Sequence, residues 1–132
     1  MTIEEMVTEF HAAMEQPINK RLSDEEYRLR LKLIGEEWTE FAEEAAAVDL
    51  AAPGEGFIKE LVDLMYVLTG TAVAMGYNLD EAIKRVHASN MSKLGPDGKA
   101  VRRADGKVLK GGMYRLPDLT DCVPMYTIAD EK

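Results

Sequence analysis

The sequence predicts an all-α fold, in which a four-helix bundle is completed by homo-oligomerisation and followed by an irregular basic C-terminal segment. The helices are predicted from segments in which apolar residues recur about every 3.6 residues and which follow residues typical of helix N-caps. Glycine and proline separate the segments from one another. The third segment is apolar on nearly every side, which is not the pattern of a helix exposed to water. The chain has 132 residues, of which 46% are hydrophobic, so it is large enough for one compact domain with a core.

The first two helices are predicted from their caps. The first is expected from Ile3 to Met14, with Thr2 as its N-cap. The second is expected from Asp24 to Val48, because Ser23 and Glu26 have the spacing of a capping box and the apolar residues that follow recur at close to 3.6 residues. A proline–glycine pair ends this second helix.

The third helix, expected from Gly56 to Met75, carries the main argument for an oligomer. Asp63 is the only charged residue between Leu61 and Met75. A helix that is apolar all round needs burial all round, and three short companion helices do not easily surround it. We therefore expect a second copy of the chain to cover it, with a dimer as the simplest case. The fourth helix is expected from Leu79 to Lys93.

The chain changes character after the fourth helix. Glycines and prolines punctuate a basic and mostly polar stretch. The turn dipeptide Asp105-Gly106 predicts a small hairpin between Val101–Ala104 and Lys107–Leu109. We expect a single domain over residues 1–132, with a helical core at about 3–93 and a tail at about 94–120.

Charge is distributed unevenly along the chain, whose net charge is −8. Residues 1–63 hold 16 acidic and 6 basic side chains, a net of −10, whereas residues 84–115 hold 9 basic and 2 acidic side chains, a net of +7. A negative protein is a poor general binder of nucleic acid or of an anionic membrane surface, so we expect neither partner. The basic segment either binds phosphate groups or only neutralises the acidic half, and charge alone does not separate the two.

The remaining bulk features predict a cytoplasmic protein. The single cysteine, Cys122, excludes an internal disulfide and a thiolate metal cluster within one chain. The N-terminus is acidic and lacks the pattern of a signal peptide. The longest apolar stretch, from Leu64 to Met75, is too short to span a membrane.

Asp63 and Glu60 are the first candidate functional residues. They lie three residues apart, so they share one face of a helix that is otherwise apolar. A buried carboxylate without a partner is costly or becomes protonated. Lys59 is adjacent to Glu60 in sequence, and we expect its side chain to point elsewhere. The pair therefore needs a cation from another source.

The second helix offers a matching set of acids. Glu36 and Glu40 are four residues apart, and Glu37 and Glu40 are three apart. Antiparallel packing of the second and third helices would set Glu37 and Glu40 opposite Glu60 and Asp63. Converging carboxylates suit a hard divalent cation with oxygen ligands. Glutamate-rich helices are also common as plain solvated faces, and this alternative stays open for the second helix taken alone.

The two acidic segments, Glu36-Glu37-Trp38-Thr39-Glu40 and Glu60-Leu61-Val62-Asp63, lie 19 residues apart. Together they resemble the signature of the all-α NTP pyrophosphohydrolase superfamily, which includes MazG-type enzymes, dimeric dUTPases and phosphoribosyl-ATP pyrophosphohydrolases. That signature is two glutamates, two residues, a glutamate, a spacer and then Glu-x-x-Asp. The resemblance implies a MazG-like bundle.

A later segment carries a second likeness. An Asn-x-x-Lys pair at the end of the fourth helix and an Asp-Gly-Lys…Lys element after it resemble the C-terminal phosphate- and substrate-binding segment of MazG-like members. The substrate-binding residues that this likeness implies are Asn90, Lys93, Arg103, Asp105, Lys107 and Lys110. The resemblance covers roughly residues 7 to 120.

The resemblance implies a hydrolase that cleaves a (d)NTP between its α and β phosphates, giving (d)NMP and pyrophosphate, in the house-cleaning of nucleotide pools. It implies Mg²⁺, with Mn²⁺ as the alternative ion, and a homodimer or a dimer of dimers. The catalytic acids are then Glu36, Glu37, Glu40, Glu60 and Asp63. The last four of these ligate the metal, while Glu36 either accepts the proton of the attacking water or completes the metal shell.

Two other functions stay open at this point. The chain could act on a nucleotide-like metabolite such as phosphoribosyl-ATP. It could also be a non-catalytic helical dimerisation module whose acids bind a structural metal, although dimerisation alone has no need for the basic segment. A P-loop motif and an H-E-x-x-H motif are both absent from the sequence.

Overall fold

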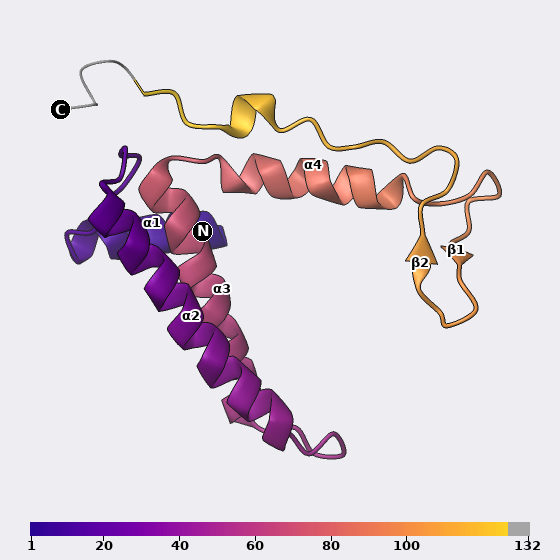
Figure 1. Ribbon diagram of the computed structural model, residues 1–132, viewed down its shortest axis with the longest axis horizontal. Helices are drawn as coiled ribbons and strands as arrows, with labels where there is room; N and C mark the ends of the chain where they lie inside the picture. Colours follow the sequence, from indigo (N-terminus) through magenta and orange to yellow (C-terminus); the bar gives the residue numbers. More distant parts are fainter. Residues whose placement is uncertain (127–132) are drawn as a thin grey trace. The chain divides into compact units, whose positions relative to one another are not determined.

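The computed structural model describes residues 1–126, which form four α-helices, one two-stranded hairpin and a short 3₁₀-helix (Figure 1). The helices are α1 (Ile3–Ala13), α2 (Asp24–Ala47), α3 (Glu55–Met75) and α4 (Leu79–Met91). The strands are β1 (Val101–Arg102) and β2 (Val108–Leu109), and the 3₁₀-helix η1 is Thr120–Cys122. The all-α prediction is confirmed, and every predicted helix end agrees with the structure to within two residues.

Contacts divide the chain into two compact units. The first contains residues 1–77 and 124–126 and holds α1, α2 and α3; the second contains residues 78–123. Within the second unit, α4 packs against η1. The prediction of a single domain over the whole chain stays a prediction.

Helices α1, α2 and α4 begin where the sequence predicted because a side chain accepts a hydrogen bond from a free N–H group in the first turn of each. The Thr2 hydroxyl accepts a hydrogen bond from the Glu5 amide at 3.1 Å. Both halves of the Ser23–Glu26 capping box are formed at the start of α2. Helix α3 ends at Gly76, whose φ of 85° is a left-handed conformation that glycine adopts without strain.

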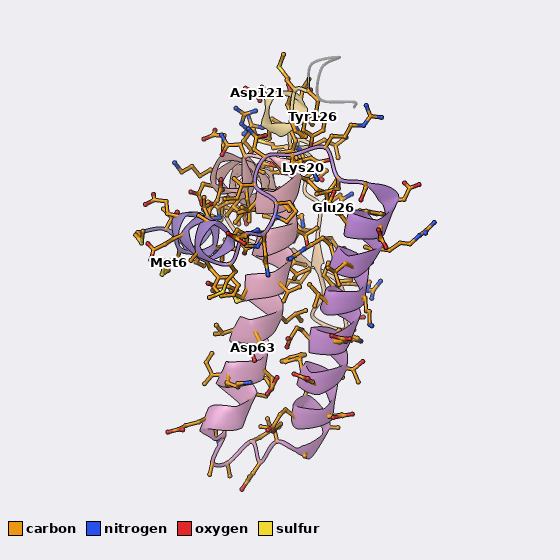
Figure 2. All side chains as sticks on the ribbon, turned by 90° about the vertical axis from the view of Figure 1, so that its left-hand side faces the viewer. Met6, Lys20, Glu26, Asp63, Asp121 and Tyr126 are labelled. Carbon is orange, nitrogen blue, oxygen red and sulfur yellow. The ribbon has the colours of Figure 1, made fainter. Side chains whose placement is uncertain are left out.

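Helix α3 is the centre of the first unit, because both α1 and α2 pack against it. A loop after α2 reverses the chain, so α2 and α3 run antiparallel and side by side (Figures 1 and 2). Val7 of α1 and Val73 and Ala74 of α3 are buried where α1 meets α3. This arrangement fixes the register between the acidic faces of α2 and α3.

Two buried polar side chains meet α3 at Gly70. The Arg30 guanidinium donates hydrogen bonds to the carbonyl oxygen of Val67 at 2.8 Å and to the hydroxyl of Thr71 at 3.2 Å. The His11 Nδ1–H donates to the Pro17 carbonyl, with 2.8 Å between nitrogen and oxygen. A Cβ atom at Gly70 would lie 2.6 Å from Arg30 Nη2 and 2.8 Å from His11 Nε2. Glycine is therefore required for this close approach of α1, α2 and α3.

The first unit leaves large apolar side chains in contact with solvent. Along α3, Ile58, Val62, Met65 and Leu68 recur at helical spacing and are exposed. Helix α1 exposes a second set, Ile3, Met6, Phe10 and Met14. The rings of Phe10 and Tyr66 are in edge-to-face contact with centroids 5.5 Å apart, so the α1 and α3 sets adjoin. Residues 1–126 of one copy do not supply the all-round burial that the apolar pattern of α3 calls for.

In the second unit, the segment after the hairpin is bonded back to α4. The Ser89 hydroxyl donates to the Arg115 carbonyl at 2.7 Å, and the Arg115 amide donates to the Ser92 hydroxyl at 3.0 Å. Arg85, at the middle of α4, forms an ion pair with Asp121 of η1. The hairpin itself is confirmed, with β1 and β2 antiparallel across the predicted Asp-Gly turn.

Among the helices of residues 1–126, none combines the length and the apolar character that crossing a lipid bilayer requires.

Candidate metal centre and phosphate-binding segment

Helices α2 and α3 contribute two carboxylates each to one small volume. Glu37 and Glu40 come from α2, and Glu60 and Asp63 come from α3. One carboxylate oxygen from each residue lies within 4.8 Å of the corresponding oxygens of the other three. Figure 2 shows α2 and α3 adjacent over this stretch, with Asp63 on α3. The predicted convergence of these four acids is confirmed.

Two of the carboxylate oxygens in this cluster are buried and unsatisfied. Glu37 Oε2 and Glu60 Oε2 have no hydrogen-bond partner among residues 1–126. The Glu60 side chain is 15% exposed, whereas that of Asp63 is 35% exposed and is thus less buried than we expected. Buried polar atoms in folded proteins almost always have a partner, so two orphaned oxygens within one group of converging carboxylates indicate a ligand position.

The environment of the cluster raises the pKa of the Glu37 carboxyl group. Burial raises the pKa of its carboxyl group, and the charges of Glu40, Asp63 and Glu60 raise the pKa further. The folded protein therefore binds a proton at Glu37 more readily than the unfolded chain does. The sign follows from linkage: the metal-free protein loses stability as the pH rises through the folded-state pKa of Glu37.

Lys59 lies at the cluster, and the expectation that it points elsewhere is wrong. Its Nζ is 2.7 Å from Asp63 Oδ2 and 3.4 Å from Glu60 Oε1. The reason is that Lys59 and Asp63 are four residues apart, a spacing that places two long side chains on the same helical face. Hydrogen bonds to Asp63 and to Glu60 raise the pKa of Lys59, so its ammonium group stays charged.

The donor set fits a hard divalent cation. Carboxylate oxygens are the ligands that Mg²⁺ and Mn²⁺ prefer, and facing carboxylates on neighbouring helices are an established way to build such a centre. One lysine does not neutralise four carboxylates. Glu36, the fifth predicted acid, is exposed and lies outside the group of four. It lines an open hollow of about 460 Å³ together with Glu40.

Residues 3–90 match the phosphoribosyl-ATP pyrophosphohydrolase family. The chain belongs to this family. The family is part of the MazG-like all-α NTP pyrophosphohydrolase superfamily, so the resemblance seen in the sequence is confirmed and the protein is a pyrophosphohydrolase. The matched range includes all four clustered carboxylates and Asn90, and it ends before Lys93. No curated protein matches the chain.

The six residues assigned to substrate in this pyrophosphohydrolase lie in the second unit. Asn90 is exposed on α4, and the carbonyl of Lys93 accepts a hydrogen bond from the Gly111 amide at 3.0 Å. Arg103 forms an ion pair with Asp105, with 2.5 Å between Nη2 and Oδ2. The Asp105 carboxylate also accepts from the backbone amide two residues later, so it shapes the hairpin turn.

The two remaining lysines of the set are both exposed. Lys110 Nζ lies 4.7 Å from the centre of the Tyr114 ring, a cation–π arrangement. Lys107 follows the turn glycine, Gly106, and no carboxylate within residues 1–126 forms an ion pair with it. The hairpin thus presents basic side chains to solvent, but the roles of all six residues stay predictions.

Sequence reasoning missed Gly111, which joins the hairpin to α4. A Cβ atom at this position would lie 2.8 Å from the carbonyl oxygens of both Lys93 and Leu94. Its own carbonyl accepts from the Tyr114 amide at 3.1 Å. The backbone of Gly111 is therefore hydrogen-bonded both to Lys93, just after α4, and to Tyr114, whose ring lies beneath Lys110. The glycine pair Gly111-Gly112 after the hairpin is visible in the sequence, but the sequence does not indicate which of the two is closely packed.

Proposed function

We propose that this protein hydrolyses a (d)NTP between the α and β phosphates in the presence of Mg²⁺, releasing (d)NMP and pyrophosphate. The observation that carries the proposal is the pair of buried, unsatisfied oxygens of Glu37 and Glu60 inside a cluster of four carboxylates. A triphosphate is itself an anion, so such a cluster binds it only through divalent cations.

Glu37, Glu40, Glu60 and Asp63 would hold the metal. When bound, Mg²⁺ or Mn²⁺ supplies charge neutralisation for the phosphate oxygens and a lower pKa for a coordinated water. Glu36 is exposed beside the group and is our candidate for accepting the proton of that water, with completion of the metal shell as its other role.

The basic segment of the second unit would bind the phosphates. Lys93, Lys107 and Lys110 are suited to stabilising the negative charge that pyrophosphate carries as it leaves, and Asn90 is suited to bonding a phosphate or the sugar. The ion pair between Arg103 and Asp105 makes Arg103 the weakest member of this set, since its guanidinium already has a carboxylate partner.

A second copy of the chain is the partner we propose for the exposed apolar side chains of α1 and α3. The stripe along α3 and the set on α1 adjoin through Phe10 and Tyr66, which makes one continuous surface. Monomeric proteins rarely expose apolar patches of this kind. Covering this surface with the same surface of a second copy gives a symmetric dimer, and pairing of dimers gives the tetramer.

Phosphoribosyl-ATP is the second candidate substrate, and the description of the matched family favours it. Both substrates contain a triphosphate, so the carboxylate cluster serves either one. If (d)NTPs are the substrates, we propose that the protein works in the cytoplasm in the house-cleaning of nucleotide pools.

The test is a panel of canonical and modified NTPs, dNTPs and phosphoribosyl-ATP, assayed with Mg²⁺ and with separation of monophosphate plus pyrophosphate from diphosphate plus phosphate. We expect the wild type to release monophosphate and pyrophosphate, and we expect a Glu60→Gln variant to release neither. Glu9→Gln, an exposed acid on α1, is the matched control and should retain activity. Turnover of phosphoribosyl-ATP alone would favour the second candidate, and absence of any turnover would leave a non-catalytic metal-binding module.

A further inference from the structure

Lys59 occupies the position at the carboxylate cluster where a cation is needed. Its ammonium group contacts Asp63 at 2.7 Å and Glu60 at 3.4 Å, and both of these acids belong to the group of four. The lysine side chain is 66% exposed, and it lies in the second turn of α3, so it can leave without disturbing packing. The ammonium is therefore bound to the cluster but is not built into the core.

We propose that Lys59 is a resident counter-cation that a divalent ion must displace, so that this residue sets the metal affinity of the site. The inference rests on the proposed metal centre and adds to it a residue outside the five predicted acids. Asp63 Oδ2 and Glu60 Oε1 are engaged by the ammonium, whereas the buried Oε2 atoms of Glu37 and Glu60 remain unsatisfied.

The physical basis is competition for the same oxygens. Two cations a few ångströms apart repel each other. An ammonium group that donates a hydrogen bond to a carboxylate oxygen also competes with a metal ion for that oxygen. A divalent ion carries twice the charge of lysine and accepts oxygen ligands from several residues at once, so it wins when its concentration is sufficient. Without metal, Lys59 offsets part of the repulsion among the four acids.

The variant Lys59→Gln removes the charge and keeps a side chain of similar length and helix propensity. We expect Mn²⁺ to bind this variant about three- to ten-fold more tightly than the wild type, which is the range for loss of a partly solvated competing charge. We also expect the metal-free variant to melt at a lower temperature than the metal-free wild type. Lys59→Arg keeps the charge and should show no gain in affinity.

The control is Arg28→Gln. Arg28 is exposed on α2, more than two helical turns before Glu37, and its replacement changes the net charge by the same amount. Its Mn²⁺ affinity should change by less than about two-fold, because exposed charges at longer range are screened.

The experiment is calorimetric titration of the full-length, metal-free proteins with Mn²⁺ alone, together with their melting temperatures. Tighter binding by Lys59→Gln only, with Lys59→Arg and Arg28→Gln close to wild type, supports the proposal. Unchanged or weaker binding by Lys59→Gln overturns it and leaves the metal centre standing. Failure of the wild type to bind Mn²⁺ at all overturns both this proposal and the metal centre on which it rests.

Discussion

Adding one methyl group at Gly70 is predicted to destabilise the first unit strongly. The new Cβ would lie 2.6 Å from Arg30 Nη2 and 2.8 Å from His11 Nε2. Both atoms are the ends of side chains, but both side chains are over 90% buried and hydrogen-bonded. Neither has free space to retreat into, so Gly70→Ala separates α3 from α1 or α2.

The size of the effect follows from three contributions. Overpacking a well-packed interior costs about 1–3 kcal/mol. Loss of the bond between the Arg30 guanidinium and the Val67 carbonyl costs about 1.5–3 kcal/mol, because the donor is charged. Alanine returns about 1 kcal/mol through its higher helix propensity. We therefore expect a net loss of about 1.5–5 kcal/mol in the free energy of unfolding, or roughly 6–20 °C in Tm for a chain of this size.

The matched control is Gly35→Ala, on α2. Gly35 is helical and exposed, and a Cβ there would meet nothing within 4 Å. The same methyl group should therefore stabilise the protein by about 0.5–1 kcal/mol. Thermal and urea unfolding, followed by circular dichroism, measures both variants. Equal stability of the two would refute the packing of His11 and Arg30 around Gly70.

Three further predictions concern the site and the assembly. Glu37→Gln should raise the Tm of the metal-free protein near neutral pH, because burial and neighbouring charges disfavour the ionised form of Glu37. The same variant should remove the Tm shift that Mn²⁺ produces, because a metal ligand is lost; a lower metal-free Tm would contradict the first expectation. Gly111→Ala should raise KM for a triphosphate more than it lowers kcat, because the added Cβ would meet two carbonyl oxygens. Gly112→Ala should leave KM unchanged, because a Cβ there would meet nothing within 4 Å; equal KM values for the two variants would exclude the hairpin junction from substrate binding. Met65→Glu should convert the protein to a monomer in light scattering, because it places a charge in the exposed apolar surface of α3. Leu50→Glu, at a loop residue that is 86% exposed, should leave the mass unchanged. An unchanged mass for Met65→Glu would exclude this face of α3 as the interface.

Local signals made most of the fold predictable. Helix starts depend on capping residues such as Ser23 and Glu26, and a capping box is legible because both members lie within one turn. The hairpin follows from its turn dipeptide, and Gly106 adopts the positive φ of 89° that such a turn needs. The convergence of four carboxylates was predictable as well, because consecutive antiparallel helices bring fixed faces together.

Features that depend on side-chain reach or on long-range packing were not predictable. Lys59 turns toward Asp63 because a flexible four-carbon side chain can reach its own helical face, which spacing permits but does not require. The meeting of His11 and Arg30 at Gly70 joins three helices, and no local pattern specifies such a contact. The packing of α4 against η1 likewise joins segments that are distant in sequence.

The central claim is that the four clustered carboxylates bind Mg²⁺ for cleavage of an α–β phosphoanhydride. The most direct measurement is ³¹P NMR of a (d)NTP incubated with the wild type and with Asp63→Asn, each with and without Mg²⁺. We expect equal amounts of monophosphate and pyrophosphate from the wild type with Mg²⁺ only, and no product from a folded Asp63→Asn. Release of diphosphate and inorganic phosphate, or near-normal turnover by Asp63→Asn, would contradict the metal-dependent α–β cleavage.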